Sequence, residues 1–432
     1  MMKKVFIKDI AKHLGEEVKL QGWVRNIRSS GKLLFIIVRD GTSEIQAVAF
    51  LPELGEEKAE LAKTLTLESS LEIIGIPKEH PKQKGVYELS VIDVKPIQIS
   101  HDYPIAKKEH GTDFLLSNRH LWLRSSRQWA VMKIRHTVYY AICDYLNENG
   151  FYRFDSPILT PSACEGTTTL FEVPYFDEGN AYLSQSGQLY LEAGIMSLGR
   201  VYDFGPVFRA EKSKTRKHLT EFWMMDAEAA FVEHEENMKI QEGLIRFVIR
   251  RVLERNLSDL ELLERDTERL KKADTPFRRI THREAIDQLK AKGVEIDYND
   301  DFGAQEEAML TEGSEVPLFI ERWPKAIKAF YMKRDPENPD LVLGNDIIAP
   351  DGFGEIIGGS QREDNFDFLK SRMIDDNMSL EEYQWYLDLR QYGSVPHSGF
   401  GIGLERLVAW MSGVQHIRET IPFPRMIYRI YP

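Results

Sequence analysis

The chain contains only two cysteines, Cys143 and Cys164, among its 432 residues. Two cysteines cannot form a disulfide framework or a cysteine-rich zinc site, so we expect a reducing, cytoplasmic location. No run of about 18 apolar residues occurs, so no transmembrane helix is expected. The charged start MMKKVFIKDIAKHLGEE does not resemble a secretory signal. We therefore expect no membrane partner.

An excess of positive charge is also absent. The net charge is −12, which argues against a protein coated with nucleic-acid-binding charge. Positive residues still cluster locally, at Arg25, Arg28 and Lys32, at Arg119, Arg124 and Arg127, and at Lys212, Lys214, Arg216 and Lys217. Any one of these clusters, taken alone, is better interpreted as a solvated face.

The common phosphate-binding loop G-x-x-x-x-G-K-[ST] is missing as well. Gly31-Lys32 is followed by leucine and lacks the upstream glycine. If the chain handles ATP, it does so without a P-loop.

Residues 1–100 are expected to form a β-rich domain. Short apolar or alternating runs, separated by Gly, Pro, Asp and Ser, occur at 18–28, 33–41, 44–50, 69–79 and 87–99. Five strands with a helical patch at about 52–64 predict a small Greek-key barrel of the OB type. No long amphipathic helix separates the strands, so a parallel βαβ unit is not expected.

Residues 101–118 carry a proline and charges and are expected to be a hinge. Residues 119–432 are expected to form an α+β domain on a mainly antiparallel sheet with flanking helices. Apolar residues at helical spacing predict a helix at about 125–150, and about 234–325 is expected to be a helical insertion. Strand-like runs recur at 181–185, 200–210, 221–232, 317–323, 326–333 and 341–350.

The segment VFRAEKSKTRKHLTEFW, residues 207–223, carries groups suited to a nucleotide. Strand alternation places Arg209 and Glu211 on one face. An arginine can fork onto a phosphate, and a glutamate can accept from an adenine amino group. Aromatic residues on the returning strand could stack on a base. An Arg–Glu surface pair on an ordinary hairpin is the alternative, and the segment alone favours that alternative.

The segment SGFGIGLER near the C-terminus is a second candidate anion site. Gly399, Gly401 and Gly403 suit a strand that a ligand or another backbone approaches closely. A helix starting near Arg406 would combine an arginine with a helix N-terminus, which favours phosphate. The spacing is G-x-G-x-G and no βαβ context surrounds it, so it is not a dinucleotide fingerprint. A glycine-rich packing strand is the alternative.

The segment GNDIIAPDGFGEIIGGSQR contains two candidate Mg²⁺ ligands, Asp346 and Glu355. Hard cations prefer carboxylate oxygens and commonly accompany nucleotide phosphates. Turn and surface carboxylates are the alternative, which is favoured for the pair alone.

Together, these segments resemble the class II aminoacyl-tRNA synthetases. That family has three motifs in order. The helix followed by FYRFDSPILTP, VFRAE with its loop, and GFGIGLERL resemble them in order, spacing and C-terminal position. An OB-type domain at the N-terminus narrows the resemblance to the aspartate/asparagine/lysine subclass, over essentially the whole chain. The resemblance implies ATP as substrate, Mg²⁺, a tRNA partner and a homodimer whose interface includes Pro157.

The resemblance assigns roles in adenylate formation. Arg209 would contact the ATP α-phosphate and the amino-acid carboxylate, Glu211 the adenine amino group, and Phe222 would stack on the ring. His218 and Arg406 would hold the β- and γ-phosphates. Asp346 and Glu355 would place Mg²⁺, although the family often has a shorter gap between these carboxylates.

The segment YLSQSGQLYLEA decides the amino acid. Aspartate enzymes have a lysine three residues after the second glutamine, and that position is Leu191. Leucine cannot neutralise a carboxylate, so an amide substrate, L-asparagine, is favoured. QSGQLY, EGTTTLFEV, VPHSGFGIGLER and IPFPR also resemble the asparagine branch, as in bacteria. By that resemblance Glu165 and Gln188 would hold the α-amino group, Arg362 the amide oxygen and Asp226 the amide nitrogen.

One residue departs from the asparagine branch. That branch commonly has glutamate at position 226, whereas this chain has the aspartate of the aspartate branch. An aspartate enzyme, including one that charges both tRNAs, therefore remains an alternative to a ligase for tRNA(Asn). A tRNA-independent asparagine synthetase and a tRNA-binding paralogue without activity are the others, and the complete barrel and the intact Arg209, Glu211, Glu355 and Arg406 argue against them.

In the N-terminal domain the resemblance suggests an anticodon site. Phe35 could stack on an anticodon base, Gln46 could read its edge, and Arg25 and Arg28 could bind phosphates. A core aromatic is the alternative for Phe35.

Overall fold

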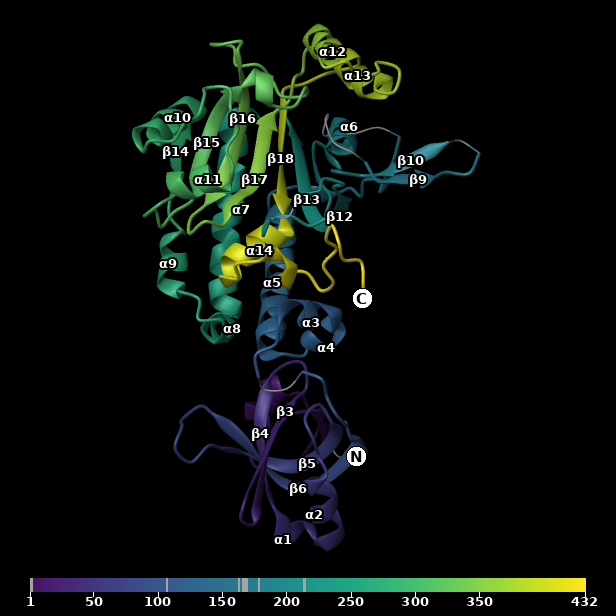
Figure 1. Cartoon of the computed structure of the whole chain (residues 1–432), viewed down its shortest axis with the longest axis vertical. Coiled ribbons are helices and arrows are strands. Elements are labelled where there is room, and N and C mark those ends of the chain that lie inside the picture. Colours follow the sequence, from purple (N-terminus) through teal and green to yellow (C-terminus); the bar gives the residue numbers. More distant parts are fainter. Residues whose placement is uncertain (1–2, 106–107, 162–163, 165–169, 178, 213–214) are drawn as a thin grey trace. The chain divides into compact units, whose positions relative to one another are not determined.

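The computed structural model describes residues 3–105, 108–161, 164, 170–177, 179–212 and 215–432 (Figure 1). The chain divides into two compact units, Met1–Gly111 and Thr112–Pro432. Residues 112–117 form helix α3 (Thr112–Ser117), so the segment expected to be a hinge at 101–118 ends in a helix of the second unit.

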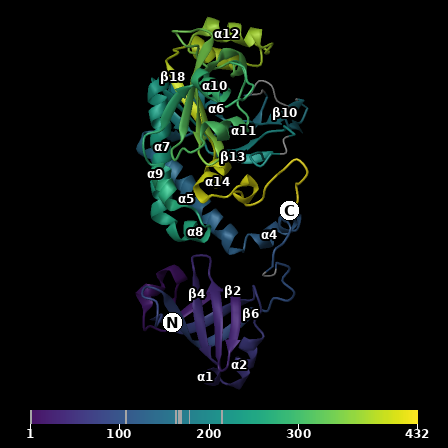
Figure 2. The same ribbon diagram turned by 60° about the vertical axis from the view of Figure 1, so that its left-hand side comes forward.

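The first unit is a six-stranded sheet that closes on itself. In its described part the strands are β1 (Lys3–Lys4), β2 (Val18–Ser30), β3 (Leu33–Arg39), β4 (Glu44–Phe50), β5 (Ser70–Glu79) and β6 (Tyr87–Gln98). The order is β1-β2-β3-β4-β6-β5, and β2 also pairs with β5, which completes the ring (Figure 2). The helical pieces are η1 (Ile7–His13), α1 (Leu51–Leu54) and α2 (Glu56–Lys63). The OB-type fold expected from the sequence is confirmed.

Strand alternation builds the core of this unit. Leu34, Ile36 and Val38 of β3 are buried, while the residues between them face outward. Because side chains alternate across a strand, Phe35 lies on the outer face and is not a core aromatic.

The second unit carries the remaining elements. Its strands are β7 (Tyr152–Arg153), β8 (Leu159–Thr160), β9 (Glu172–Pro174), β10 (Asn180–Leu183), β11 (Arg200–Tyr202), β12 (Gly205–Phe208), β13 (Glu221–Ala230), β14 (Arg278–Thr281), β15 (Leu318–Pro324), β16 (Leu341–Ala349), β17 (Gly354–Gln361) and β18 (His397–Gly403). Its helices after α3 are α4 (Arg119–Trp122), α5 (Ser126–Glu148), α6 (Gln188–Leu198), α7 (His234–Arg255), α8 (Leu257–Leu262), α9 (Thr267–Lys272), α10 (His282–Ala291), α11 (Ala304–Leu310), η2 (Lys325–Ile327), α12 (Phe366–Asp375), α13 (Gln384–Gln391), α14 (Leu404–Ser412) and η3 (Ile417–Glu419).

A nine-stranded sheet organises the described part of this unit. Its order is β14-β15-β16-β17-β18-β13-β11-β7, with β12 paired to β13. All pairings are antiparallel except β7 with β11 and β14 with β15, so the mainly antiparallel sheet is confirmed. Helices α5 and α7 supply buried residues such as Val138 and Val248 to a core shared with Phe400 of β18. A buried helix layer of this kind fixes the strands that carry the site.

Two sequence expectations need correction. The segment expected to be a helical insertion, 234–325, contains β14 and β15, which extend the main sheet. Residues 326–333, expected to be a strand, form a 3₁₀ turn and a single bridge between Met332 and Arg362. Lys328 and Met332 of this segment line a cavity, which an irregular backbone allows.

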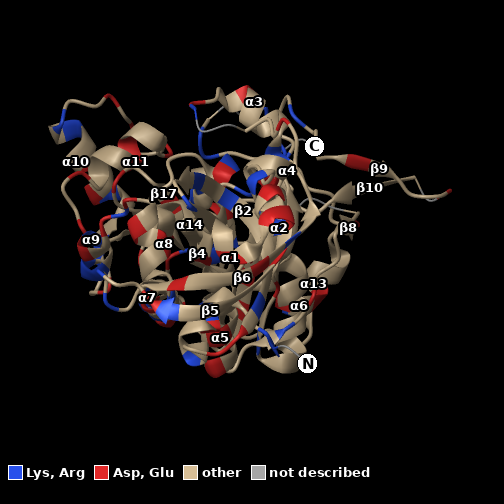
Figure 3. Cartoon of the chain, turned by 90° about the horizontal axis from the view of Figure 1, so that it is seen from below, with Lys and Arg blue, Asp and Glu red and all other residues tan. Residues whose placement is uncertain are grey.

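Charge is dispersed in both units, with basic and acidic residues interspersed along their elements (Figure 3). No helix in the described ranges is long and apolar enough to cross a membrane.

Candidate active site

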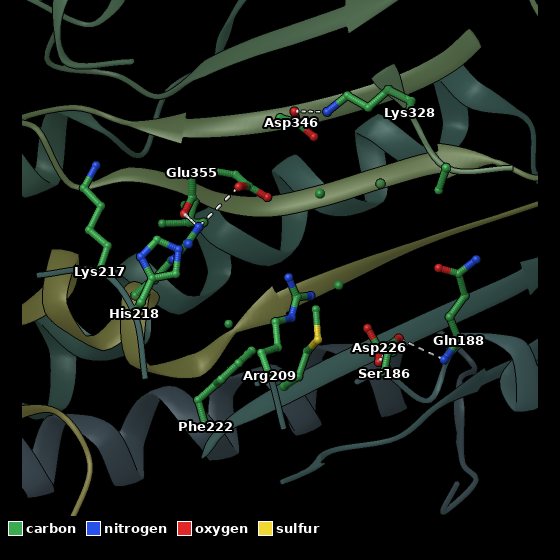
Figure 4. A pocket seen from close by; sticks show the side chains of 18 of the residues that line it. Ser186, Gln188, Arg209, Lys217, His218, Phe222, Asp226, Lys328, Asp346 and Glu355 are labelled. Carbon is green, nitrogen blue, oxygen red and sulfur yellow. Dashed lines mark hydrogen bonds and ion pairs between the residues drawn. The ribbon is translucent and has the colours of Figure 1, made fainter. Parts of the chain in front are cut away.

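A cavity of about 450 Å³ lies over β13, β17 and β18 of the second unit. Residues that the sequence suggested for ATP, amino-acid and metal binding line it together: Gln188, Arg209, Glu211, His218, Phe222, Asp226, Asp346, Glu355, Arg362 and Arg406. Figure 4 shows Arg209, Phe222 and His218 on one side of the cavity and Gln188 with Asp226 on the other. We call these two sides the arginine end and the glutamine end.

At the arginine end, a strand pair sets Arg209 against Phe222. Arg209 follows β12, and its backbone N–H donates to the Thr220 carbonyl at 3.0 Å. Val207 of β12 pairs with Phe222 of β13, and the Arg209 guanidinium carbon lies 5.7 Å from the Phe222 ring centroid. A cation and an aromatic face at this spacing suit a phosphate joined to a planar base.

An ion pair joins the motif around Arg406 to β17. Arg406 Nη1 lies 3.2 Å from Glu355 Oε2 and also donates to the Glu355 carbonyl at 3.1 Å. Burial acts to raise the pKa of Glu355, but the charges of Arg406, Lys328 and Arg209 together outweigh it and the pKa is lowered. The pair is charged at neutral pH and partly open to solvent.

His218 is held as a neutral ring beside these cations. Burial, followed by the charges of Arg406 and Arg209, lowers the pKa of His218. Its Nδ1 is hydrogen-bonded to the Thr215 hydroxyl. A polyanion that matched the two arginines would remove part of this penalty and favour the protonated ring.

Asp346 and Glu355 converge over a glycine. A Cβ on Gly358 would lie 3.2 Å from Glu355 Oε1 and 3.6 Å from Asp346 Oδ1, so the space between the carboxylates exists because residue 358 has no side chain. Burial raises the pKa of Asp346 to about 7, although the charge of Lys328 opposes the shift. In the described residues no group of three or more His, Cys, Asp or Glu is arranged to hold a metal. A divalent cation here would need oxygens from a ligand, which suits Mg²⁺.

Lys328 is a cavity residue that the sequence reasoning missed. Its Nζ lies 2.9 Å from Asp346 Oδ2 and 3.6 Å from the Trp323 ring centroid. The irregular segment after β15 brings it there. No local pattern marks such a lysine, because its partner is a strand away.

At the glutamine end, Asp226 is a buried carboxylate with neutral donors. Its Oδ2 accepts from Ser186 Oγ at 2.8 Å and from the Gly187 N–H at 2.9 Å. Asp203 lies behind it and accepts from the Asp226 N–H at 3.3 Å. Burial, followed by the charge of Asp226, raises the pKa of Asp203 to about 8. Asp203 therefore holds a proton at neutral pH.

Arg362 is bound by a second buried carboxylate. Arg362 Nε lies 3.1 Å from Glu228 Oε1, and its Nη1 donates to Ser360 Oγ at 2.6 Å. Two of the glycines make room for these carboxylates. A Cβ on Gly399 would lie 2.0 Å from Glu228 Oε1, and one on Gly401 would lie 2.6 Å from Asp226 Oδ1. The glycine strand thus admits close packing by β13 at these two positions.

Leu191 does not line the cavity. Its side chain is fully buried in a separate apolar cluster with Ile195, Val201 and Ala230. We placed Leu191 in the amino-acid site from the sequence because counting residues gives its position along the chain but not the direction in which its side chain points. Glu165, also expected there, lies outside the described residues.

In the first unit, the four residues suggested for an anticodon lie on β2, β3 and β4. Arg28 pairs with Phe35, and its guanidinium carbon lies 4.6 Å from the ring centroid. Gln46 on β4 pairs with Ile37, on the outer face that also carries Phe35. Arg25 Nε lies 3.6 Å from Glu44 Oε1. The group forms a patch with an aromatic face, an amide and two cations.

Pro157 lies in an exposed stretch of the second unit. Its neighbours Ile158 and Leu159, and Tyr152 of β7, are large apolar side chains open to solvent. An exposed apolar stretch of this kind is typical of a surface that another protein covers.

Comparisons with known proteins agree with both units. A family described as "tRNA synthetases class II (D, K and N)" matches residues 111–427, and "OB-fold nucleic acid binding domain" matches residues 18–97. Two curated relatives, both named asparagine–tRNA ligase, align over the full length of both chains. One, from Desulforamulus reducens, is 54% identical, and one, from Streptococcus pneumoniae, is 51% identical.

Solved structures show the same similarity. The asparaginyl-tRNA synthetase of Pyrococcus horikoshii complexed with asparaginyl-adenylate has a TM-score of 0.96 at 45% identity, with all of both chains covered. The Entamoeba histolytica asparaginyl-tRNA synthetase with the same adenylate has a TM-score of 0.90 at 33% identity, again over both whole chains.

Proposed function

The chain belongs to the class II tRNA synthetases of the D, K and N group, and we propose that it is an asparagine–tRNA ligase. It activates L-asparagine with ATP to asparaginyl-adenylate, releases diphosphate, and transfers the asparaginyl group to tRNA(Asn). The identity of 54% and 51% over the full length with two proteins named asparagine–tRNA ligase is the observation that carries the choice of amino acid. Asp226 is compatible with this choice, because its buried carboxylate lies in the cavity. A carboxylate there attracts an amide nitrogen and repels the side chain of aspartate.

The remaining charge at the glutamine end supports an amide. Arg362 is a cation of this end, and the buried carboxyl group of Glu228 already occupies its Nε at hydrogen-bonding distance. Binding aspartate as the substrate would bury a second carboxylate beside Asp226. This costs several kcal/mol unless a cation pairs with that carboxylate. In this proposal Arg362 donates to the amide oxygen and Asp226 accepts from the amide nitrogen.

The α-amino group of the substrate binds beside these residues. Gln188 lines the cavity, and its amide oxygen accepts from the α-ammonium. We assign the same task to Glu165.

At the arginine end, adenylate formation needs positioning and charge more than proton transfer. The asparagine carboxylate attacks the α-phosphorus in line, and the bond to the bridging oxygen breaks so that diphosphate leaves. Arg209 contacts the α-phosphate and the attacking carboxylate, and stabilises charge as it develops in the transition state. Glu211 accepts from the adenine amino group, and Phe222 stacks on the ring. His218 and Arg406 bind the β- and γ-phosphates, which requires Arg406 to leave Glu355.

Asp346 and Glu355 are the residues that would hold Mg²⁺. Bound there, the ion would supply positive charge that stabilises the diphosphate leaving group. Lys328 keeps Asp346 in place and matches its charge.

The first unit binds the tRNA anticodon. Phe35 stacks on a base, Gln46 reads a base edge, and Arg25 and Arg28 contact phosphates. The ribose hydroxyl at the end of the tRNA then attacks the adenylate carbonyl in the second unit, and AMP leaves. Translation takes place in the cytoplasm, which is the location we propose.

We also propose a homodimer whose interface includes Pro157. The exposed apolar side chains around it, Tyr152, Ile158 and Leu159, would be covered by a second copy.

ATP–pyrophosphate exchange with asparagine and with aspartate tests the function. We expect asparagine-dependent exchange to exceed aspartate-dependent exchange by at least about 100-fold in kcat/KM, the value of roughly 3 kcal/mol of discrimination. Equal or greater exchange with aspartate would point to the aspartate enzyme, including one that charges both tRNAs. Charging of tRNA(Asn) by the same preparation separates the ligase from a synthetase that does not use tRNA.

A further inference from the structure

Glu192 is a fully buried carboxylate that the proposed reaction does not use directly. It lies on α6, one helical turn after Gln188, and its side chain has no exposed surface. The Tyr386 hydroxyl donates to it at 2.8 Å, His397 Nε2 lies 3.0 Å from it, and Arg390 forms a short ion pair with it. Residues far apart in the sequence, on α6, α13 and β18, therefore meet at one carboxylate.

The fourth partner of Glu192 is Gln188. Gln188 Nε2 donates to Glu192 Oε1 at 3.1 Å. An ionised carboxylate can only accept hydrogen bonds, so the amide must present its nitrogen to Glu192 and its oxygen to the other side. Figure 4 shows the oxygen of Gln188 turned toward the cavity side on which Asp226 lies, with the nitrogen turned away. Glu192 thereby decides which of the two amide orientations Gln188 adopts.

The charge on Glu192 is secure. Burial acts to raise its pKa, but the charge of Arg390 and the contact with His397 outweigh burial and hold the pKa far below its usual range. Glu192 does not line the cavity itself. Gln188 does line the cavity and is hydrogen-bonded to Glu192, so Glu192 can orient a group that meets the ligand through Gln188.

We propose that Glu192 is a positioning residue for recognition of the substrate α-ammonium, because it holds the Gln188 amide with its oxygen toward the cavity. A cation in the cavity then meets the amide oxygen of Gln188, which accepts hydrogen bonds. If the amide were flipped, it would instead present two N–H donors to the cation. This inference rests on the proposed function in one respect, the contact between Gln188 and the α-amino group. It predicts that Glu192 acts on one group of the ligand and leaves its carboxylate and amide unaffected.

Two ligands isolate that group. Asparagine carries the α-ammonium, whereas succinamate has the same carboxylate and terminal amide with a hydrogen in its place. Isothermal titration calorimetry of the full chain measures the dissociation constant of each, and the exchange assay measures KM for ATP.

Glu192→Gln is the first variant, since a glutamine can accept or donate and no longer fixes the orientation of Gln188. We expect asparagine to bind about tenfold more weakly, the loss of one hydrogen bond to a charged group, with succinamate and the KM for ATP within about twofold of wild type. Equal weakening of both ligands would show a purely structural role and overturn the proposal. An unchanged affinity for asparagine would also overturn it.

Two further variants separate positioning from folding. Glu192→Asp keeps the charge for Arg390 but withdraws the carboxylate by one methylene from Gln188, so the same asparagine-specific loss is expected even if Glu192→Gln does not fold. Tyr386→Phe removes a different donor of Glu192 and leaves Gln188 in place, so both affinities should stay within about twofold. If Tyr386→Phe reproduces the asparagine-specific loss, the effect does not pass through Gln188 and the proposal fails.

The design distinguishes failure of this inference from failure of the proposed function. If wild type binds aspartate more tightly than asparagine, the proposed amino acid is wrong. The comparison then uses aspartate with succinate, and the same ratio of affinities tests Glu192.

Discussion

The two ends of the cavity are built in opposite ways. At the glutamine end, the side chains of Arg362 and Glu228 are only 4% and 1% exposed. At the arginine end, the side chains of Arg406 and Glu355 are 27% and 39% exposed. Both ends hold an Arg–Glu pair, but one pair is sealed in the core and the other is open to solvent.

This difference in burial suits the glutamine end to selecting the amino acid and the arginine end to binding ATP. A buried ion pair leaves an uncompensated charge when it is broken, so the glutamine end is held in one arrangement before the ligand arrives. A partly exposed pair contributes little to stability and can exchange its partner for a phosphate. The sealed end is therefore suited to choosing a small substrate, and the open end to admitting a flexible triphosphate.

The largest effect is expected at the open end. Arg209→Ala removes the cation that meets both the α-phosphate and the attacking carboxylate, so exchange should fall about 10³-fold, as for loss of one transition-state donor. The dissociation constant of asparagine should change far less. Arg283→Ala, an exposed arginine on α10 outside the cavity, is the matched control and should leave exchange unaltered. If Arg209→Ala weakens asparagine binding as much as it slows exchange, the division between the ends is wrong.

The second largest effect is expected at the glutamine end, where Asp203 should make the free energy of unfolding depend on pH. Burial and the charge of Asp226 raise the pKa of Asp203 to about 8, above roughly 3.9 in an unfolded chain. Between these values the folded protein keeps a proton that the unfolded chain has lost, so the free energy of unfolding falls as pH rises from about 4 to 8.

Asp203→Asn removes this titration. Relative to wild type, the variant should gain about 4 kcal/mol in free energy of unfolding between pH 5 and pH 9, measured by urea denaturation. The exposed Asp375→Asn on α12 is the control and should show a difference that does not vary with pH. A constant difference for Asp203→Asn would contradict a raised pKa.

The third largest effect is expected on the selectivity for asparagine over aspartate. Asp226→Asn removes the negative charge that disfavours aspartate, so the ratio of kcat/KM for asparagine over aspartate should fall about 100-fold in the exchange assay. The KM for ATP should stay within about twofold and serves as the internal control, since Asp226 lies at the glutamine end. An unchanged ratio would mean that another residue reads the amide.

The smallest effect is expected outside the cavity. Phe35→Ala removes one stacking surface from the first unit, so kcat/KM for tRNA charging should fall about tenfold while exchange is nearly unchanged. Phe6→Ala, a half-exposed aromatic of the same unit, is the matched control and should not affect charging. A parallel fall in exchange would show that Phe35 acts on the fold and not on tRNA.

Local patterns were enough to predict most of the architecture. The sequence predicted a strand at 33–41 but left Phe35 open between a stacking residue and a core aromatic. The structure shows that β3 has a solvent face, with Leu34 and Ile36 buried and Phe35 on the outer side. The order of the motifs correctly predicted that Arg209, Glu355 and Arg406 meet in one site. The proline and the charges at 101–118 predicted a hinge, but helix α3 begins inside this segment at Thr112, so the predicted end of the hinge was wrong.

The buried carboxylates could not be predicted in the same way. Glu192 touches Arg390 and His397, which lie about 200 residues further along the chain, and only the folded sheet brings them together. One signal was available in retrospect. Glu192 is the single charged residue in the apolar helix QLYLEAGIMSL, and glutamate is rarely buried without a partner. Counting residues pointed instead to Leu191, whose side chain faces a different cluster.

A crystal structure with asparagine and a non-hydrolysable ATP analogue bound tests the contrast between the ends most directly. The account predicts that Arg406 leaves Glu355, now 3.2 Å away, for the triphosphate. It predicts that the contacts of Glu192 with Gln188 and of Arg362 with Glu228 persist within about 0.5 Å. An Arg406 that stays on Glu355, or a glutamine end that rearranges around asparagine, would contradict it.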